Sequence, residues 1–543
     1  MQDGSRPAAL TEPPAATLAD RLRRAATTRG DRPALHWTGG TLSWAELDRA
    51  VDGVADALRR QASGSAAGHP ARVAIALGNT PDFAIALLGT LRAGLVAVPV
   101  NPAFTGPELR HVLADSAAAV LICTEPVRDL VAEVSGELPA LTEVHTRLPA
   151  APPPPSGPEA SAGSTERPAV ADGEELAVLL YTSGTAGQPR GAMLSHRALA
   201  ANHEQIGRIE PPVVGPEDTV LLALPLFHAY GLNAGLGAVV HHGASGVLVD
   251  RFEPDEVLAL VERHRVSLLV GVPSMFAAWR GPELAAAASS VRTAICGAAP
   301  LPPETGSRYA EATGRPIQVG YGLTETAPVL TSTLAAPVPK PGSIGRPLPG
   351  VQLRLVGPDG EVLWRDDDPG GDPGPEDDLD LDLHSPGTDP GEIVVRGHNL
   401  FSGYWPDGRD GPDAEGWWRT GDIGYADADG DLFLVDRLGE LILVNGFNVY
   451  PQEVERVLDA HPGVAESAVF GVPHPATGET VHAYVVRVPG GTVSAADLAG
   501  HCARSLARFK CPSGIEFVGS LPRSAIGRVR RSMLRQVGGR GDE

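Results

Sequence analysis

The sequence contains almost no lysine. Lys340 and Lys510 are the only lysines among 543 residues, so nearly every side-chain cation is an arginine. Cysteine is also rare, and the wide separation of the four cysteines fits neither a zinc site nor a disulfide framework. They are Cys123, Cys296, Cys502 and Cys511. The first residues, Met1 to Ser5, lack the basic-then-apolar pattern of a secretion signal, so these absences predict a cytoplasmic protein.

Long apolar runs and excess positive charge are absent too. The most apolar stretch, 220–249, is interrupted by Pro225, His228, two further histidines and five glycines, which predicts a buried core segment and no membrane span. Acidic residues outnumber basic ones by 66 to 44, giving a formal charge of −22. Because phosphate contacts need clustered cations, this balance disfavours nucleic acid or an anionic membrane as a partner. Part of the excess lies in the Pro-, Gly- and Asp-rich segment 366–389, a predicted solvated loop.

The length and the hydrophobic periodicity indicate the fold class. A chain of 543 residues exceeds one compact core, so we expect at least two domains. Segments with strand and helix patterns alternate near the N-terminus, which predicts an α/β fold with a doubly wound parallel sheet covered on both faces. The expected helices are 17–26, 43–58 and 82–93, and the expected strands are 41–43, 73–77 and 94–100. The segment 150–168, rich in Pro, Ser, Ala and Gly, predicts a surface linker.

The stretch from Leu179 to Gly191 is the most informative part of the chain. An apolar run, 176–180, predicts a buried strand, and it is followed by small hydroxyl residues and glycines that end on Arg190. Glycines let the backbone approach an anion, hydroxyls donate hydrogen bonds, and the cation neutralises charge, so this loop is suited to phosphate. It lacks the Gly-Lys-Ser/Thr ending of the common nucleoside-triphosphate loop. The alternative interpretation is a polar turn between two strands.

The order Tyr-Thr-Ser-Gly-Thr-x-Gly-x-Pro-basic-Gly resembles the phosphate loop of the adenylate-forming enzymes: acyl-CoA synthetases, peptide-synthetase adenylation domains and luciferases. Four further segments, beginning at Leu224, Gly297, Trp417 and Asp436, match that family in the same order. The resemblance covers roughly residues 15 to 535. It implies a large N-terminal AMP-binding domain with doubly wound sheets, residues 1–436, and a small mobile α+β C-terminal domain, residues 437–543.

The resemblance also implies a nucleotide site for ATP. Its phosphate loop would use Thr182, Ser183, Gly184, Thr185, Gly187 and Arg190. The adenine would lie against Gly297, Ala298 and Ala299, with Tyr321, Gly322 and Thr324 beside it. Asp422 would accept hydrogen bonds from both ribose hydroxyls, which the two oxygens of a carboxylate suit, and Arg437 would hold the ribose side of the nucleotide.

The remaining implied roles concern chemistry and the other substrates. Glu325 is the expected ligand of Mg²⁺, and Thr185, His228 and Arg528 are expected catalytic residues alongside it. The acyl pocket would be lined by His228, Tyr230, Gly297, Gly320 and Val329. Coenzyme A would bind along Asn445 and Gly446, where glycine admits the pantetheine arm.

Three positions depart from the family pattern. Arg190 and Arg528 stand where lysine is usual. The resemblance implies that the residue at 528 bridges the substrate carboxylate and the α-phosphate, and there arginine is a broad planar fork that threads less easily than an ammonium between two oxyanions. Gly439 stands at the expected pivot of the C-terminal domain, where a charged or polar residue is more usual. Glycine absorbs backbone changes easily, so rotation is still expected.

Taken together, these features predict a ligase that activates a fatty or aromatic acid as acyl-AMP and transfers it to coenzyme A, as in fatty acid metabolism. No aspartate lies between Leu224 and Leu232 to pair with an ammonium, which weighs against an amino-acid substrate. Two alternatives stay open: transfer to an acyl carrier protein or another nucleophile, and a degenerate member with weak adenylation because of Arg528.

Overall fold

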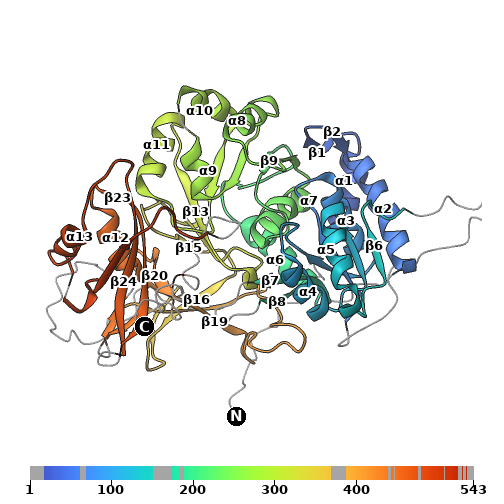
Figure 1. Cartoon of the computed structure of the whole chain (residues 1–543). Helices are drawn as coiled ribbons and strands as arrows, with labels where there is room; N and C mark the ends of the chain where they lie inside the picture. The colour runs from blue at the N-terminus through green and yellow to red at the C-terminus, as the bar shows by residue number, and fades with distance from the viewer. Residues whose placement is uncertain are drawn as a thin grey trace, which may run out of the picture.

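The computed structural model describes residues 17–61, 69–150, 173–182, 189–279, 281–367, 387–437, 442–444, 447–449, 451–474, 478–506, 508–523, 529 and 534. The expected linker 150–168 and the expected acidic loop 366–389 lie almost entirely outside these residues. Figure 1 shows the N-terminal part as layered sheets and helices on one side and the C-terminal elements β23, β24, α12 and α13 on the other.

The first sheet has six strands in the order β6-β5-β3-β4-β7-β8, and every neighbouring pair is parallel except β7 with β8. The strands are β3 (Arg72–Ala76), β4 (Val96–Pro99), β5 (Val120–Cys123), β6 (Glu143–His145), β7 (Leu176–Thr182) and β8 (Arg190–Ser195). The helices that follow them are α3 (Pro81–Arg92), α4 (Gly106–Asp115), α5 (Glu125–Val134) and α6 (His196–Ile206).

Strand β3 shows why this sheet forms. Its alternate residues enter two different cores: Val73 and Ile75 pack in one, Ala74 and Ala76 in the other. A strand buried on both faces has no polar side, which explains its continuous apolar sequence.

The second sheet has nine strands in the order β15-β14-β13-β12-β11-β9-β10-β1-β2. Its centre, from β1 to β13, is parallel, and antiparallel strands complete both edges. The central strands are β1 (Pro33–Trp37), β9 (Thr219–Leu222), β10 (Ser245–Leu248), β11 (Leu268–Gly271), β12 (Thr293–Cys296) and β13 (Ile317–Tyr321). The edge strands are β2 (Gly40–Ser43), β14 (Thr331–Ser332) and β15 (Arg346–Pro347).

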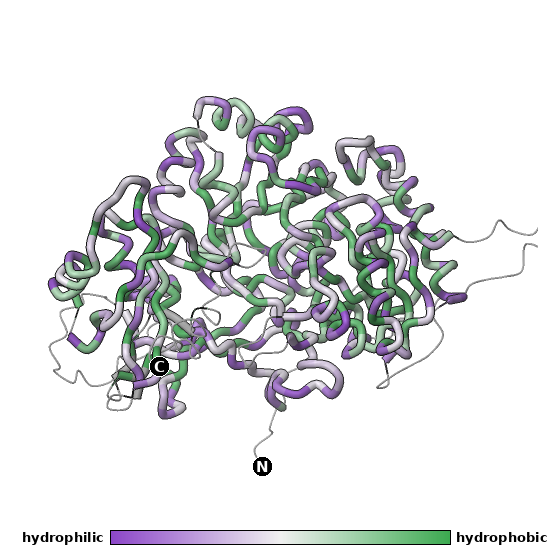
Figure 2. Tube along the Cα trace, in the orientation of Figure 1, coloured by the Kyte–Doolittle hydropathy of each residue, from purple (hydrophilic) through white to green (hydrophobic). Residues whose placement is uncertain are grey.

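Helices cover this sheet and join it to the first. They are α1 (Leu18–Arg29), α2 (Trp44–Gln61), α7 (Ala238–His242), α8 (Pro254–Arg263), α9 (Pro273–Ala278), α10 (Pro282–Ala287) and α11 (Pro303–Thr313), with a π-helical segment η2 (Tyr230–Gly237). A capping box between Thr17 and Asp20 starts α1. Figure 2 shows apolar segments through the interior and polar segments on the outer helices, the amphipathic arrangement that the sequence periodicity indicates.

Two smaller sheets complete the described fold. One is antiparallel, in the order β17-β16-β18-β19-β20, with β16 (Gln352–Val356), β17 (Val362–Arg365), β18 (Gly391–Arg396), β19 (Trp417–Ala426) and β20 (Leu432–Arg437). The other lies in the C-terminal part, in the order β22-β21-β24-β23 with β25 beside β24. Its elements are β21 (Ile442–Val444), β22 (Phe447–Val449), α12 (Pro451–Asp459), β23 (Val464–His474), β24 (Gly478–Arg487), α13 (Ala495–Cys502) and β25 (Gly514–Phe517).

The prediction of a large α/β domain with a smaller C-terminal α+β domain is confirmed. The expectation of parallel sheets needs one refinement. The two large sheets are mixed at their edges, and the sheet that carries Asp422 is antiparallel throughout. In this sheet, a short turn joins β16 to β17 and another joins β19 to β20, and such turns allow consecutive strands to pair antiparallel without a crossover helix.

Candidate functional site

The predicted phosphate loop joins two antiparallel strands. Strands β7 and β8 pair with Tyr181 opposite Gly191 and Thr182 opposite Arg190. Thr182 and Arg190 therefore stand at the two ends of the loop, while Ser183, Gly184, Thr185 and Gly187 lie outside the described residues. A side chain at position 191 would place its Cβ 2.8 Å from Leu179 Cδ1, so glycine here lets the Leu179 side chain pack directly over β8.

A segment that the sequence did not single out lies against this hairpin. Residues 401–410, here called the strap, hydrogen-bond to β8: Trp405 N donates to Gly191 O at 2.8 Å, and Met193 N donates to Gly403 O at 3.1 Å. The strap also reaches the loop that carries the predicted metal ligand, because Phe401 N donates to Glu325 O at 2.9 Å. It therefore ties the phosphate hairpin to Glu325.

Arg190 is held by two groups of the strap. Its NH2 lies 2.6 Å from Asp410 Oδ2, and its guanidinium carbon lies 3.8 Å from the centre of the Tyr404 ring. Guanidinium stacks well on an aromatic face, since the ring's quadrupole attracts the flat cation. The cation is thus placed at the mouth of the phosphate hairpin.

Glu325 lies in the short 3-10 helix η4 (Thr324–Thr326) and is 6% exposed. Its Oε1 accepts a hydrogen bond from the Tyr404 hydroxyl at 2.6 Å. Burial, and then the neighbouring Glu325 carboxylate, raises the pKa of Tyr404, so the hydroxyl keeps its proton and acts as the donor.

The donor set at Glu325 fits magnesium. Mg²⁺ bound with a nucleotide takes one or two carboxylates and fills its other positions with phosphate oxygens and water. Within the described part of the chain, the second oxygen of Glu325 has no hydrogen-bond donor, so one carboxylate oxygen is available for the ion.

Tyr321 and Asp422 come together from two different sheets. The Tyr321 hydroxyl, at the end of β13, donates to Asp422 Oδ2 on β19 at 2.6 Å. Asp422 is 4% exposed, and its backbone N–H donates to Thr420 Oγ1 at 3.1 Å. Arg437 pairs with Asp422 through the backbone ladder of β19 and β20, which puts these two predicted ribose residues next to each other in the sheet.

The adenine segment follows β12 directly. Ala298 adopts a φ of 69°, an uncommon conformation for a residue with a side chain, between Gly297 and Ala299. Gly322, which follows Tyr321, has no room for a side chain because an added Cβ would lie 1.8 Å from Pro328 O. Thr324 starts η4 on the same loop.

The predicted acyl-pocket residues come together in two groups, Gly297 with Tyr230 and His228, and Gly320 with Val329. An added Cβ on Gly297 would lie 3.0 Å from the Tyr230 ring, and one on Gly320 would lie 4.0 Å from Val329 Cγ1. His228 precedes the π-helical segment, and Tyr230 N donates to His228 Nδ1 at 3.4 Å. The Tyr230 hydroxyl is buried and has no hydrogen-bond partner among the residues that the structure describes, and burial raises its pKa.

Several predicted residues cannot be placed. Asn445, Gly446 and Arg528 lie outside the described residues, and so does the side chain of Arg437. The expected coenzyme A contact and the expected C-terminal cation stay predictions. Tyr404 and Asp410 are the residues that sequence reasoning missed. The sequence feature that could have indicated them is Gly403-Tyr404-Trp405, an aromatic pair after a glycine. It has no fixed spacing from the phosphate loop, so the sequence does not connect the two.

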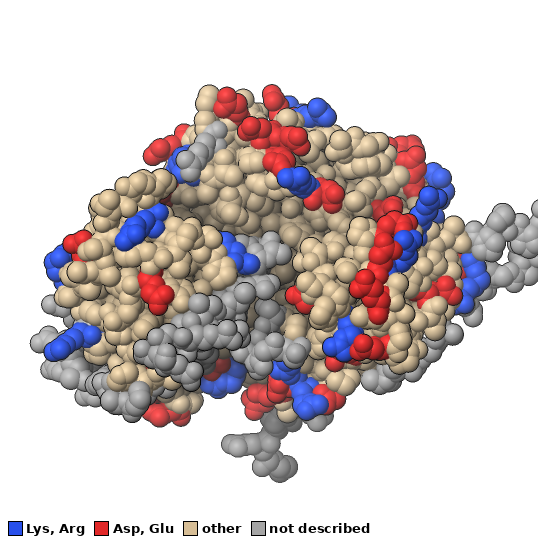
Figure 3. Space-filling model, viewed as in Figure 1, with Lys and Arg blue, Asp and Glu red and all other residues tan. Residues whose placement is uncertain are grey.

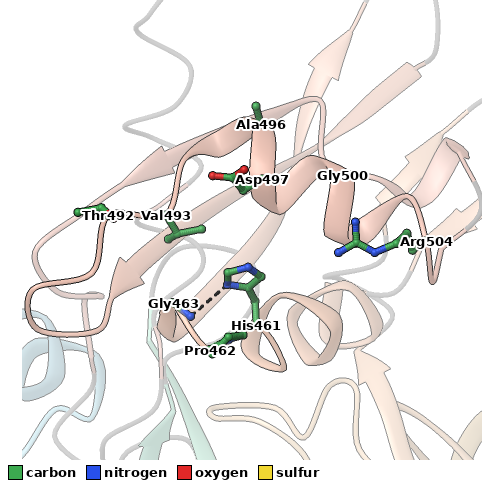
Figure 4. A pocket seen from close by; sticks show the side chains of 9 residues that line it. All are labelled: His461, Pro462, Gly463, Thr492, Val493, Ala496, Asp497, Gly500 and Arg504. Atoms are coloured by element: carbon green, nitrogen blue, oxygen red, sulfur yellow. Dashed lines mark hydrogen bonds between the residues drawn. The ribbon is translucent and has the colours of Figure 1, made fainter.

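A separate cavity of about 680 Å³ lies in the C-terminal part, between the end of α12 and α13 (Figure 4). None of the predicted site residues lines it. Its polar groups serve the local fold: His461 Nδ1 accepts from Gly463 N at 3.1 Å, and Asp497 forms a capping box with Ser494. This cavity is therefore not part of the candidate site.

Charges are mixed over the surface. On the face drawn in Figure 3, basic residues are scattered and lie beside acidic ones. Among the helices of the described residues, none has the length and apolar character needed to cross a membrane.

The fold and this arrangement of groups together define the class of the protein: they are those of adenylate-forming enzymes. The family model of the AMP-binding enzymes matches residues 22–405, and that of the AMP-binding enzyme C-terminal domain matches residues 453–528. The chain belongs to the AMP-binding enzyme family.

Its relatives include acid–CoA ligases. Feruloyl-CoA synthase of Amycolatopsis sp is 37% identical over 92% of this chain and 94% of its own length. A long-chain-fatty-acid–CoA ligase of Yersinia pestis is 32% identical over 96% and 94%. Among solved structures, ATP-bound MatB from Rhodopseudomonas palustris aligns with a TM-score of 0.81, at 32% identity over 96% of this chain and 98% of that one. The prediction of an acid–thiol ligase is confirmed.

Proposed function

We propose that this chain activates a carboxylic acid with MgATP and transfers the acyl group to coenzyme A. The observation that carries the proposal is the hydrogen bond between Tyr321 and Asp422, two motif residues from different sheets. It orients a buried carboxylate beside an aromatic ring, which suits a ribose and its base. The relatives named for CoA ligation support the acceptor.

The reaction has two steps. In the first, a carboxylate oxygen of the acid attacks the α-phosphorus of ATP, and pyrophosphate leaves with its bridging electron pair. In the second, the thiolate of coenzyme A attacks the acyl carbon and AMP leaves. The chain's residues bind and orient the reacting groups in both steps, because phosphoryl transfer depends on positioning and charge stabilisation.

Each group has a defined part in the first step. Asp422 would hold the ribose, and Arg190 with the loop residues would hold the departing phosphates. Glu325 would hold Mg²⁺, which supplies neutralisation of phosphate charge when bound. Arg528 is the residue expected to bridge the substrate carboxylate and the α-phosphate.

The acid itself is proposed to be aromatic, with a polar substituent. A buried hydroxyl without a partner costs about 1–3 kcal/mol, and a polar group on the acid would remove this cost at Tyr230. A plain fatty acid would leave the hydroxyl unsatisfied. Both kinds of acid occur among the substrates named for the relatives.

Acid-dependent exchange of labelled pyrophosphate into ATP tests adenylation without involving the acceptor. We expect exchange with ferulate, weaker exchange with a long-chain fatty acid, and thioester formation when coenzyme A is added. Exchange without thioester formation, rescued by a phosphopantetheine-charged carrier protein, would favour the carrier protein as acceptor. ATP binding without exchange on any acid would favour the degenerate alternative.

The boundary between the two domains is proposed at residues 436/437. Strand β20, the last strand of the antiparallel sheet, ends at Arg437, one residue past this boundary, and β21 belongs to the C-terminal sheet. Limited proteolysis should cut within 436–440 or within the acidic segment 366–389. Cleavage confined to the interior of either domain, outside the acidic segment 366–389, would contradict this boundary.

A further inference from the structure

We propose that Tyr404 is a positioning residue that joins the metal-binding carboxylate to the phosphate-loop cation, and that its ring suits the site to arginine at position 190. The proposal rests on the proposed function, because it concerns how the same site binds MgATP. It goes beyond the residues that the sequence analysis assigned to the site, since the strap was not among them.

The hydroxyl of Tyr404 contacts the predicted metal ligand, Glu325. Its hydroxyl donates to Glu325 Oε1 at 2.6 Å, which fixes the rotation of the carboxylate and leaves the other oxygen to face a ligand. Groups that hydrogen-bond a metal ligand hold it in its productive orientation and affect metal affinity strongly. The buried position of Glu325, 6% exposed, strengthens this contact by excluding water.

The ring face of Tyr404 contacts the cation of the phosphate loop, Arg190. The Arg190 guanidinium carbon lies 3.8 Å above the ring centre, while Asp410 holds the NH2 at 2.6 Å. A planar guanidinium can stack on the ring and pair with the carboxylate at once. The ammonium of a lysine is a compact, strongly hydrated charge and would gain less from the same ring.

The backbone of the strap makes Tyr404 rigid enough for this role. Tyr404 N donates to Arg409 O and Gly408 N donates to Tyr404 O, both at 2.9 Å. Tyr404 also forms an antiparallel bridge with Ala192 of β8, and its ring meets Phe401 edge-to-face at 5.0 Å. Because its backbone and its ring are both held in place, Tyr404 can keep Glu325 and Arg190 in fixed positions relative to each other.

Substitutions can separate the hydroxyl contact to Glu325 from the ring contact to Arg190. Tyr404→Phe removes the hydroxyl and keeps the ring, whereas Arg190→Lys keeps the charge and removes the stacked plane. Tyr404→Leu removes both. We would measure, on the full-length chain, the dissociation constants of MgATP and of ATP in EDTA by calorimetry, and the Mg²⁺ concentration for half-maximal pyrophosphate exchange.

We expect Tyr404→Phe to raise the half-maximal Mg²⁺ concentration about tenfold, with ATP binding in EDTA unchanged. Arg190→Lys should weaken ATP binding with and without Mg²⁺ by about threefold to tenfold. Arg190→Lys in the Tyr404→Leu background should have no further effect, because the platform is already gone.

Matched controls are Tyr309→Phe on α11 and Arg292→Lys, whose partner Asp218 lies elsewhere. Both should leave every titration unchanged. Should Tyr404→Leu fail to fold, Tyr404→Phe and Arg190→Lys decide the question alone.

An unchanged Mg²⁺ requirement in Tyr404→Phe, or ATP binding by Arg190→Lys as tight as in the wild type, would overturn the proposal. A wild-type chain that binds MgATP but exchanges no pyrophosphate would contradict the proposed function only, and the binding titrations would still decide the role of Tyr404. A wild-type chain that binds no ATP would contradict both.

Discussion

The nucleotide end and the acyl end of the site differ in the hydrogen bonding of their tyrosine hydroxyls. At the nucleotide end, the hydroxyls of Tyr321 and Tyr404 both donate to carboxylates at 2.6 Å. At the acyl end, the buried hydroxyl of Tyr230 has no partner in the described part of the chain. The nucleotide is the substrate common to the class, so its polar groups are oriented in advance. The acid is the substrate that varies, so we infer that the bound acid itself supplies the missing partner.

Buried polar atoms also occur in a histidine cluster of α6 and α7. His203, His241 and His242 lie with ring centres 4.8 to 5.9 Å apart, and each has a buried ring nitrogen for which the described residues offer no partner. Among the described residues their nitrogens do not converge as metal ligands do. A buried polar atom without a partner therefore indicates a substrate contact only where a ligand has access to it.

The largest effect is expected at Asp422. Asp422→Ala should abolish nucleotide-dependent activity, because it removes the ribose acceptor and leaves the Tyr321 hydroxyl buried without its partner. Calorimetry should show loss of ATP binding while circular dichroism shows the fold intact. Tyr321→Phe is the control that keeps the carboxylate and should weaken ATP binding far less. Unchanged ATP affinity in Asp422→Ala would show the ribose assignment to be wrong.

Arg528 is expected to connect the two ends of the site during adenylation. Arg528→Ala should depress pyrophosphate exchange by about 100-fold to 1,000-fold, and should affect thioester formation from preformed acyl-AMP much less. Arg528→Lys should raise exchange above the wild type, since an ammonium fits better between carboxylate and phosphate. Equal exchange by all three chains would refute this role.

Acid should destabilise the histidine cluster. Burial lowers the pKa of His203 to about 3 and that of His242 to about 4, from an ordinary value near 6.5. Below pH 6.5 these histidines bind protons in the unfolded chain but stay neutral in the folded chain. The free energy of unfolding therefore decreases as the pH falls from 6.5 to about 3. For His203 the loss between pH 7.5 and 5 is about 2 kcal/mol. Denaturant titrations at the two pH values would measure it, and His242→Gln should reduce the pH dependence.

The smallest effect is expected at Tyr230 and bears directly on the comparison of the two ends. Tyr230→Phe should shift the ratio of kcat/KM for ferulate over unsubstituted cinnamate by about tenfold toward cinnamate, because the hydroxyl's hydrogen bond to the polar substituent is lost. The KM for ATP should not change. If both acids respond equally, the hydroxyl does not contact the substrate.

Local patterns in the sequence predicted most elements of the fold near the N-terminus. The expected helix 82–93 is α3 (Pro81–Arg92), and the expected strand 73–77 is β3 (Arg72–Ala76). These succeed because hydrophobic period and capping residues act within a few positions of the chain. The antiparallel sheet of Asp422 was not predicted, since the pairing of β16 with β18 joins segments on either side of the acidic insertion, and β18 and β19 are separated by the strap.

The sequence by itself determined the class of this protein, because glycines, hydroxyls and charges at fixed spacing in each motif carry their chemistry locally. It indicated Glu325, Tyr321 and Asp422 as residues of one site. Only the tertiary structure decided how they are held: Tyr321 reaches Asp422 across two sheets, and Tyr404 joins Glu325 to Arg190 from a strap more than 70 residues away in the sequence. Contacts between distant segments depend on the packing of whole sheets, and no local spacing records them.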